Sequence, residues 1–396
     1  MNRPDFDETT EKIAMPQSIR PFRCAIPEAD IDDLRERLSR TRWPERETVE
    51  DWSQGAPLEY VREICRYWAT DYDWRRVESQ LNSYQQGMAT IDGLDIHFVH
   101  APSPIPGAQP LIIVHGWPGS VFEHLDIIEP LRNPTAYGGQ PEDAYHVVVP
   151  SLPGFGFSQK PWQRGWTVER TGAALSELMQ RLGYPRFFVQ GGDWGSIVAA
   201  SMGTRQLDSV RGIHFNLAIC DPAELLKLGD PTPVESRQLD KLQYYNDWEG
   251  GYSLQQSTRP QTTGYGLVDS PAGQCAWVLE KFAAWTDCDG HPENVLTRDK
   301  MLDGISLYWF TATAASSARL YWESFKPVLS SFEPVPAPAA YSCFPRDVFT
   351  MSERWARTRY PDLRYYSQPA RGGHFPSMEQ PAVFVNEVRA GLRALT

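Results

Sequence analysis

Residues 187–197 read Phe187-Phe188-Val189-Gln190-Gly191-Gly192-Asp193-Trp194-Gly195-Ser196-Ile197. An apolar run stops at a pair of glycines, and a helix-compatible run, Ile197-Val198-Ala199-Ala200, follows. The pattern predicts a buried strand, a sharp turn and a helix, with Asp193 at the turn. Glycines suit such a turn because side chains there would collide as the backbone segments approach each other. The alternative is an ordinary strand-to-helix turn that Asp193 caps.

The five residues Gly191–Gly195 have the form of a nucleophile elbow, with aspartate where serine is usual. The helix that follows would point its free N–H groups at the site, which favours developing negative charge there. A carboxylate is suited to attack at saturated carbon, which gives an alkyl ester that water then hydrolyses. Strained epoxides and alkyl halides are the substrates that fit this chemistry.

Composition narrows the class of protein. A chain of 396 residues with 14 Trp fits one large domain with insertions. The net charge of −12 argues against nucleic acid or an anionic membrane surface as a partner. The first 18 residues are polar and predict a disordered start without signal peptide or membrane anchor.

The cysteines are scattered and contain no CxxC pair, which predicts reduced, mostly buried thiols in a cytoplasmic protein. They are Cys24, Cys65, Cys220, Cys275, Cys288 and Cys343.

Strand and helix patterns alternate over residues 91–220, which predicts a parallel sheet with helices on both faces. A hairpin turns at Asp92-Gly93 within residues 91–99. The other predicted strands are Leu111–Val114, Tyr145–Val149, the elbow strand and Val210–Ile219, and the predicted helices include Val121–Leu131 and Thr167–Leu182.

Three further parts complete the predicted organisation. Residues 1–90 form an N-terminal segment whose helices, one with Ile31, Leu34 and Leu38 on one face and one at about Leu58–Ala69, need a partner surface. Residues 221–334 are helical and rich in aromatics, which predicts an inserted cap. Residues 335–396 return to the core with strands Ala339–Phe344 and Leu363–Ser367 and a last helix at about Ala382–Leu395.

An elbow nucleophile needs an acid and a histidine downstream, in that order. His374 lies in Arg371-Gly372-Gly373-His374-Phe375, after the last predicted strand. Asp347 follows the strand Ala339–Phe344 and is the preferred acid, although it could instead cap a helix. Asp362 is the main competitor, and it opens the next strand.

At this point the sequence resembles a known family: the epoxide hydrolases of the α/β-hydrolase fold that carry an N-terminal extension. This is the microsomal type, which also includes insect juvenile-hormone and fungal enzymes. The resemblance runs from Arg20 to Leu395 and implies an α/β-hydrolase fold with an N-terminal wrapping segment and a helical cap. The resemblance rests on the motifs Pro21-Phe22-Arg23, Gly93–Phe98, His115-Gly116-Trp117-Pro118-Gly119-Ser120, Gly191–Ser196, Asp269-Ser270-Pro271, Leu279–Phe282 and Arg371–Phe375.

The family implies two cap tyrosines that reach the epoxide oxygen. Tyr252 follows a glycine ahead of Gln255-Gln256-Ser257-Thr258-Arg259-Pro260, and Tyr321 ends Ser317-Ala318-Arg319-Leu320-Tyr321. Asp347 stands in the place of the family's acid. Membrane-bound members have an anchor that is not visible here, so the resemblance implies a soluble bacterial type, most like members from antibiotic biosynthesis.

The expected mechanism follows from these assignments. Asp193 attacks an epoxide carbon while Tyr252 and Tyr321 protonate the oxygen, and water activated by His374 hydrolyses the ester. Backbone N–H groups of Trp117 and Trp194 would form the oxyanion hole, worth about 3 kcal/mol per donor. No cofactor or metal is required, and the pair His97 and His100 does not make a metal site by itself. The cap aromatics predict an apolar, aryl-bearing substrate.

Two alternatives stay open. A haloalkane dehalogenase shares the Asp, His and acid, and chloride release against diol formation separates the two enzymes. A catalytically silent ligand-binding relative would bind epoxides without turnover. The oligomeric state is not determined by the sequence, and a homodimer stays open.

Overall fold

The computed structural model describes residues 19–396, so the expectation for residues 1–18 lies outside the described part. The strands form one nine-stranded sheet in the order β1-β2-β3-β5-β4-β6-β7-β8-β9. The pairs β1–β2, β2–β3 and β3–β5 are antiparallel, and every later pair is parallel. The strands are β1 (Ile19–Phe22), β2 (Gln85–Ile91), β3 (Leu94–Ala101), β4 (Gln109–Val114), β5 (Tyr145–Pro150), β6 (Phe187–Gly191), β7 (Val210–Phe215), β8 (Ala339–Ser342) and β9 (Leu363–Ser367).

Local sequence explains the two kinds of strand pairing. β2 and β3 meet at the predicted turn, where Asp92 and Gly93 both have positive φ angles of 49° and 75°. Such a two-residue turn matches the twist of a hairpin. In β4, Leu111, Ile112 and Ile113 are fully buried, as expected for a parallel strand covered on both faces.

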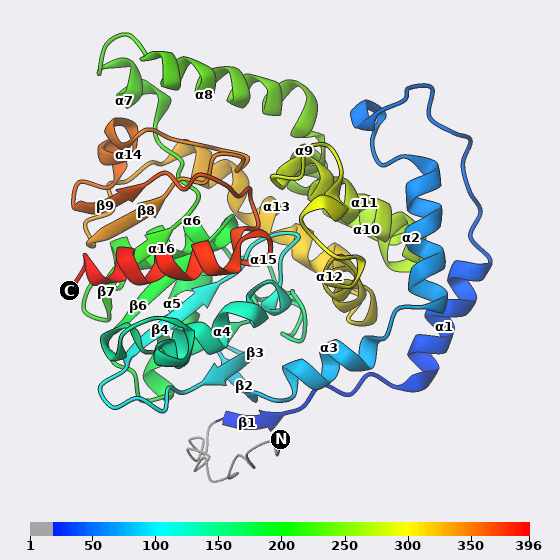
Figure 1. The fold of residues 1–396 in the computed structure, drawn as a ribbon, viewed down its shortest axis with the longest axis horizontal. Helices are drawn as coiled ribbons and strands as arrows, with labels where there is room; N and C mark the ends of the chain where they lie inside the picture. The colour runs from blue at the N-terminus through cyan, green and yellow to red at the C-terminus, as the bar shows by residue number, and fades with distance from the viewer. Residues whose placement is uncertain (1–18) are drawn as a thin grey trace, which may run out of the picture.

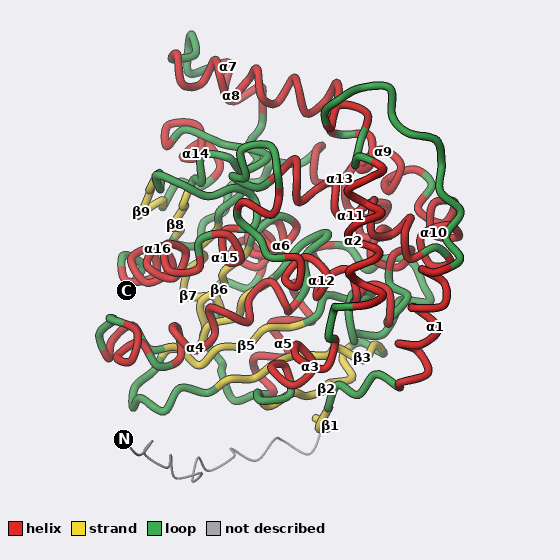
Figure 2. Tube along the Cα trace, turned by 45° about the vertical axis from the view of Figure 1, so that its right-hand side comes forward, coloured by secondary structure: helices red, strands yellow, loops and turns green. Residues whose placement is uncertain are grey.

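Helices cover both faces of the sheet, as predicted (Figure 2). α4 (Leu125–Arg132) packs with α16 (Pro381–Arg393) in front of the sheet in Figure 1, and α5 (Val168–Arg181) packs with α6 (Trp194–Arg205) behind it. Two shorter helices, α14 (Glu353–Arg359) and α15 (Pro376–Glu379), lie in the C-terminal part.

The alternation of strand and helix stops between β7 and β8, where the chain forms what we call the helical insert, residues 222–330. A π-helical turn, Tyr245–Glu249, separates its second and third α-helices. The insert contains α7 (Pro222–Leu226), α8 (Pro233–Tyr244), α9 (Gly251–Thr258), α10 (Pro260–Asp269), α11 (Pro271–Trp285), α12 (Arg298–Phe310) and α13 (Ala314–Ser330).

The N-terminal helices lie against the helical insert. α1 (Glu28–Ser39) and α2 (Leu58–Thr70) pack on α11, and α3 (Trp74–Leu81) packs on α12, as the right-hand side of Figure 1 shows. The indole N–H of Trp68 donates to Ser306 Oγ at 2.9 Å, and the Tyr72 hydroxyl donates to Asp303 Oδ1 at 2.7 Å. The segment therefore joins the sheet, through β1 and β2, to the insert.

Two element predictions need correction, and one helix was not predicted. The strand predicted over Val210–Ile219 ends at Phe215, because the chain then leaves the sheet toward the insert. The helix predicted over Val121–Leu131 begins as a 3₁₀ turn that Ser120 caps and becomes α-helical only at Leu125. α3 was not predicted, although Asp73 caps it by accepting the Arg75 N–H. The 3₁₀ turns of the structure are Trp52–Gln54, Val121–His124, Pro134–Tyr137, Pro141–Asp143 and Pro292–Asn294.

All six cysteines are buried and free, in agreement with the predicted reduced thiols. Across residues 19–396, we find no helix with the length and apolar character needed to cross a membrane.

Candidate active site

The turn between β6 and α6 presents Asp193 in a strained backbone conformation. Its φ of 50° and ψ of −129° lie outside the regions that residues with a Cβ usually adopt. Strain of this kind persists only where the surroundings enforce it, and it is concentrated at functional sites. A Cβ at Gly195 would overlap the carbonyl group of Val114, so only glycine lets α6 begin this close to β4.

The Asp193 carboxylate is held at one oxygen and faces a histidine with the other. The Trp117 N–H donates to Oδ1 at 2.8 Å, and Oδ2 lies 3.3 Å from His374 Nε2. The side chain remains 18% exposed, so the carboxylate is accessible from the adjoining cavity. The fold therefore brings Asp193 and His374 into contact, although they lie far apart in the sequence.

His374 lies on the loop between β9 and α15 and is buried. Its N–H donates to the Trp285 carbonyl at 2.8 Å, and Trp285 packs edge-on against the imidazole ring. Nδ1–H donates to Asp347 Oδ1 at 2.6 Å. Burial alone would lower the pKa of His374, but the carboxylates of Asp347 and Asp193 outweigh it and raise the pKa to about 10.

Asp347 is fully buried next to His374, after the end of β8. Its Oδ1 also accepts the Val348 N–H at 2.7 Å, which fixes the carboxylate for the imidazole. The competing acid, Asp362, is half-exposed and forms an ion pair with Arg364 at 2.9 Å. The geometry thus places Asp347, not Asp362, beside the imidazole.

Tyr252 on α9 and Tyr321 on α13 come from different helices of the insert and meet over the elbow. Their ring centroids lie 5.8 Å apart, and both rings pack on Trp117. Burial raises the pKa of each phenol well above its ordinary value of 10, so both stay protonated at neutral pH. Two buried O–H groups therefore lie close to the Asp193 carboxylate.

A third tyrosine, Tyr245, belongs to the same cluster and was missed by sequence reasoning. Its hydroxyl donates to the Tyr252 hydroxyl at 3.1 Å. Because Tyr252 accepts this hydrogen bond, its own proton is free to point elsewhere. The signal in the sequence was weak: Tyr245 lies in the π-helical turn, in a segment crowded with aromatic residues.

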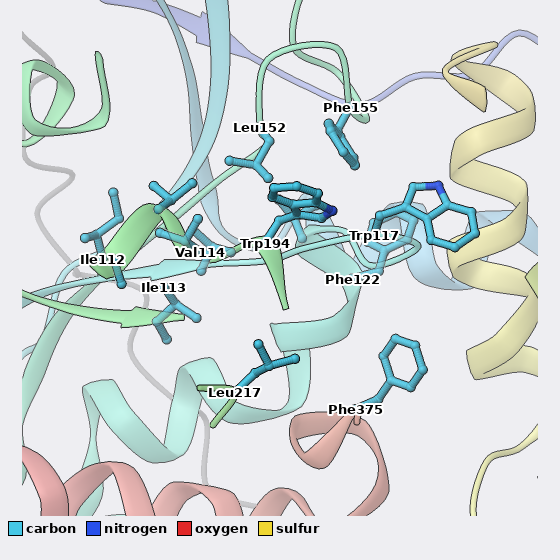
Figure 3. Close-up of a cluster of buried hydrophobic side chains, with 14 of the residues drawn as sticks. Ile112, Ile113, Val114, Trp117, Phe122, Leu152, Phe155, Trp194, Leu217 and Phe375 are labelled. Carbon is cyan, nitrogen blue, oxygen red and sulfur yellow. The ribbon is translucent and has the colours of Figure 1, made fainter. Parts of the chain in front are cut away.

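The two tryptophans expected to supply oxyanion-hole N–H groups lie beyond the carboxyl end of β4 (Figure 3). Figure 3 shows Ile112, Ile113 and Val114 along the strand and both indole rings past its end. Trp194 is the first residue of α6, where backbone N–H groups have no partner within the helix. Of the two, the Trp117 N–H contacts Asp193 as described above.

A cavity of about 260 Å³ adjoins Asp193, Tyr252 and Tyr321. A larger hollow of about 500 Å³ between the segment 152–171 and α10 and α13 contains none of the predicted site residues, so it is not the candidate site. The wall of the smaller cavity is mainly apolar and includes Leu217, Ile219, Leu242, Phe325, Val328 and Met351.

No group of three or more His, Cys, Asp or Glu side chains within residues 19–396 is arranged to hold a metal ion. His97 contacts Ser151 and Gln86 through its two ring nitrogens, and His100 contacts Tyr184.

Comparison with known proteins identifies related chains over nearly the whole length. Residues 19–124 match the family model "Epoxide hydrolase N terminus", and residues 109–258 match "alpha/beta hydrolase fold". A protein of Stigmatella aurantiaca named "Putative epoxide hydrolase" is 51% identical over 95% of this chain and 85% of its own. Epoxide hydrolase 1 of Oryctolagus cuniculus is 34% identical over 94% of this chain and 88% of its own.

A solved structure supports the same relationship. The juvenile hormone epoxide hydrolase of the silkworm Bombyx mori superimposes with a TM-score of 0.87 at 30% identity, covering 96% of this chain and 95% of the other.

Proposed function

This chain belongs to the epoxide hydrolases of the α/β-hydrolase fold, and on that premise we propose that it opens epoxides through an ester on Asp193. Water that His374 activates then hydrolyses the ester to release a vicinal diol. The observation that carries this proposal is the contact of one Asp193 oxygen with the Trp117 N–H and of the other with His374. Such a carboxylate is oriented for attack and has its hydrolytic base beside it.

In the first half-reaction, Asp193 attacks the less hindered or better activated epoxide carbon and the C–O bond of the ring breaks. The oxygen that leaves takes a proton from the pair Tyr252 and Tyr321. Support comes from the burial of both phenols, which keeps them protonated, and from the Tyr245 hydrogen bond, which leaves the Tyr252 proton free.

In the second half-reaction, esterification has removed the negative charge of Asp193. His374 then keeps only Asp347 of its two anionic partners, so its pKa falls. Its Nε2 proton passes to the tyrosinate that the first half-reaction leaves, and the neutral imidazole becomes a base. His374 takes a proton from water as the water oxygen bonds to the Asp193 carbonyl carbon. The imidazolium returns that proton to the diol oxygen when the ester C–O bond breaks. The Trp117 and Trp194 N–H groups would stabilise the oxyanion.

The substrate that we propose is an apolar, aryl-bearing epoxide. Its support is the mainly apolar wall of the 260 Å³ cavity, which offers few partners to a charged or heavily hydroxylated molecule. A role in antibiotic biosynthesis rests on sequence resemblance alone. Turnover of matched aryl and aliphatic epoxides, with chiral analysis of the diols, tests the substrate class, and a preference for aliphatic epoxides would contradict it.

The ester route and direct attack by water place oxygen differently. In a single turnover in H₂¹⁸O with enzyme in excess, the ester route gives unlabelled diol and a labelled peptide that contains Asp193. The variant His374→Gln should accumulate an adduct with the mass of the epoxide. Labelled diol together with no adduct would show that Asp193 is not the nucleophile.

Haloalkane dehalogenation, the alternative that shares Asp193 and His374, is set aside because the relatives that cover this chain are named epoxide hydrolases.

A further inference from the structure

Besides Asp193 and Asp347, two glutamates approach His374. Glu379 has a clear structural role, because it accepts backbone N–H groups from Asp287 at 2.8 Å, Gly373 at 2.9 Å and Phe375 at 3.0 Å. These bonds hold the loop that carries His374. Glu123 has no comparable set of bonds, and the mechanism described above does not use it.

Glu123 lies between the loop after β4 and the start of α15. Its Oε1 accepts the Ser377 hydroxyl at 3.3 Å, three residues beyond His374. Its Oε2 occupies the space beside Gly119 that a Cβ would need, so the glycine makes room for the carboxyl group. The Tyr308 hydroxyl donates to the Gly119 carbonyl at 3.0 Å and fixes this loop from the insert.

The electrostatics place Glu123 in the catalytic cluster. Burial raises the pKa of Glu123 to about 8; imidazolium at His374 opposes this shift, and the charges of Asp193 and Glu379 add to it. The Ser377 hydrogen bond lowers the pKa.

His374 offers the complementary feature. Its buried Nε2 makes no aligned hydrogen bond, although Asp193 Oδ2 lies 3.3 Å away. Buried polar atoms without a partner are rare in native proteins, and water commonly satisfies them. Once Asp193 is esterified and the imidazole is neutral, a water that donates one hydrogen to Nε2 has a second hydrogen to place, and a carboxyl oxygen is the acceptor that Glu123 supplies.

We propose that Glu123 is a positioning residue that holds the hydrolytic water against His374. The inference rests on the ester route proposed above. Asp347 contacts His374 at Nδ1, on the opposite side of the ring from Nε2, and Glu379 accepts three backbone N–H groups, which leaves the Glu123 carboxyl to orient the water.

The test separates the two half-reactions with styrene oxide as the probe. In single turnovers analysed by rapid quench and mass spectrometry, Glu123→Gln should hydrolyse the ester at least tenfold more slowly, while ester formation changes less than threefold. Glu129→Gln, a matched change on the neighbouring α4, should leave both rates unchanged. Hydrolysis at the wild-type rate, or an equal slowing of both steps, would overturn the role of Glu123.

A second readout distinguishes positioning from support of the fold. The pH profile of the hydrolysis rate should lose one ionisation in Glu123→Gln, and Glu123→Asp should restore part of the rate. If Glu123→Gln does not fold, the variant Ser377→Ala tests the same role, because it removes the hydroxyl that donates to Glu123. Ester hydrolysis should slow in this variant, and hydrolysis at the wild-type rate would overturn the proposal. Absence of any adduct on His374→Gln would instead overturn the ester route itself.

Discussion

At the scale of single residues, the site depends on groups whose protonation is set by burial and by neighbours. Asp193 and His374 form one charge pair, and Asp347 extends it to a line of three groups. Two phenols face this line and stay neutral because burial disfavours phenolate. An acid and a base can therefore coexist within one cavity at neutral pH.

The phenols should share the work of protonating the epoxide oxygen. Tyr252→Phe and Tyr321→Phe should each slow ester formation about 10- to 100-fold, and the double variant should nearly abolish it, because each O–H stabilises the developing alkoxide. Stopped-flow tryptophan fluorescence measures the step. Tyr265→Phe is the matched control, since that ring is 69% exposed on α10. Near wild-type rates in the double variant would contradict the assignment.

The resting enzyme should contain a cationic His374. Burial opposes the charge, but Asp347 and Asp193 raise the pKa to about 10, so the imidazolium should persist above pH 8. Histidine Cε1–H signals followed by NMR, assigned with His374→Gln, measure this. Burial lowers the pKa of His97 to about 3 and that of His115 to about 4, so those rings should stay neutral. A midpoint near 6.5 for His374 would contradict the expectation.

At the scale of elements, the elbow depends on how closely α6 approaches β4. Gly195→Ala should cost about 3 kcal/mol of unfolding free energy or prevent soluble expression, because its Cβ would overlap the Val114 carbonyl. Gly304→Ala on α12 is the matched control, since a Cβ there meets nothing within 4 Å. That change should be neutral or stabilise by about 0.5–1 kcal/mol. Urea unfolding measures the unfolding free energy of both variants, and equal values would refute the packing argument.

Elements with a strong local pattern were predictable from the sequence. The hairpin at Asp92-Gly93, the helices at Leu58 and Ala382 and the strand Leu363–Ser367 were expected within a few residues of where the structure has them. The end of β7 was not, because residues 217–219 continue the apolar pattern after the chain has left the sheet. α3 was missed because its sequence, Trp74–Leu81, is short and mostly polar.

Within the candidate site, the order nucleophile, acid, histidine was readable, and so were the motifs around Tyr252 and Tyr321. Tyr245 and Glu123 were not. Their relevance comes from contacts across the fold, with Tyr252 in one case and with Ser377 and Gly119 in the other. The spacing of these residues along the sequence does not reveal such contacts.

At the scale of the whole molecule, we propose that the helical insert acts as a cap over the sheet and that residues 19–90 hold it there. The cap supplies Tyr252 and Tyr321, whereas the sheet and its loops supply Asp193, Asp347 and His374. Catalysis therefore requires the cap and the sheet to keep their positions relative to each other.

Removing the N-terminal segment should disturb the position of the cap relative to the sheet. A fragment of residues 90–396 would lack α1, α2 and α3 and the Trp68 and Tyr72 contacts to the insert, and it should be insoluble or unstable. A fragment of residues 19–396 is the control, and it should keep the wild-type melting temperature. Soluble expression, thermal melts and epoxide turnover are the measurements. A stable and fully active 90–396 fragment would contradict a structural role for the segment.

The same contacts have a consequence for how the protein is made. Trp68 bonds to a residue 238 positions later, and Tyr72 to one 231 positions later. At about 5–20 residues per second, a ribosome needs roughly 12–48 s to add the intervening chain. During that interval the apolar face of α2 has been synthesised but its partners on α11 and α12 have not. The N-terminal helices therefore leave the ribosome well before the residues that they pack against have been synthesised, and until then their apolar faces lack a partner.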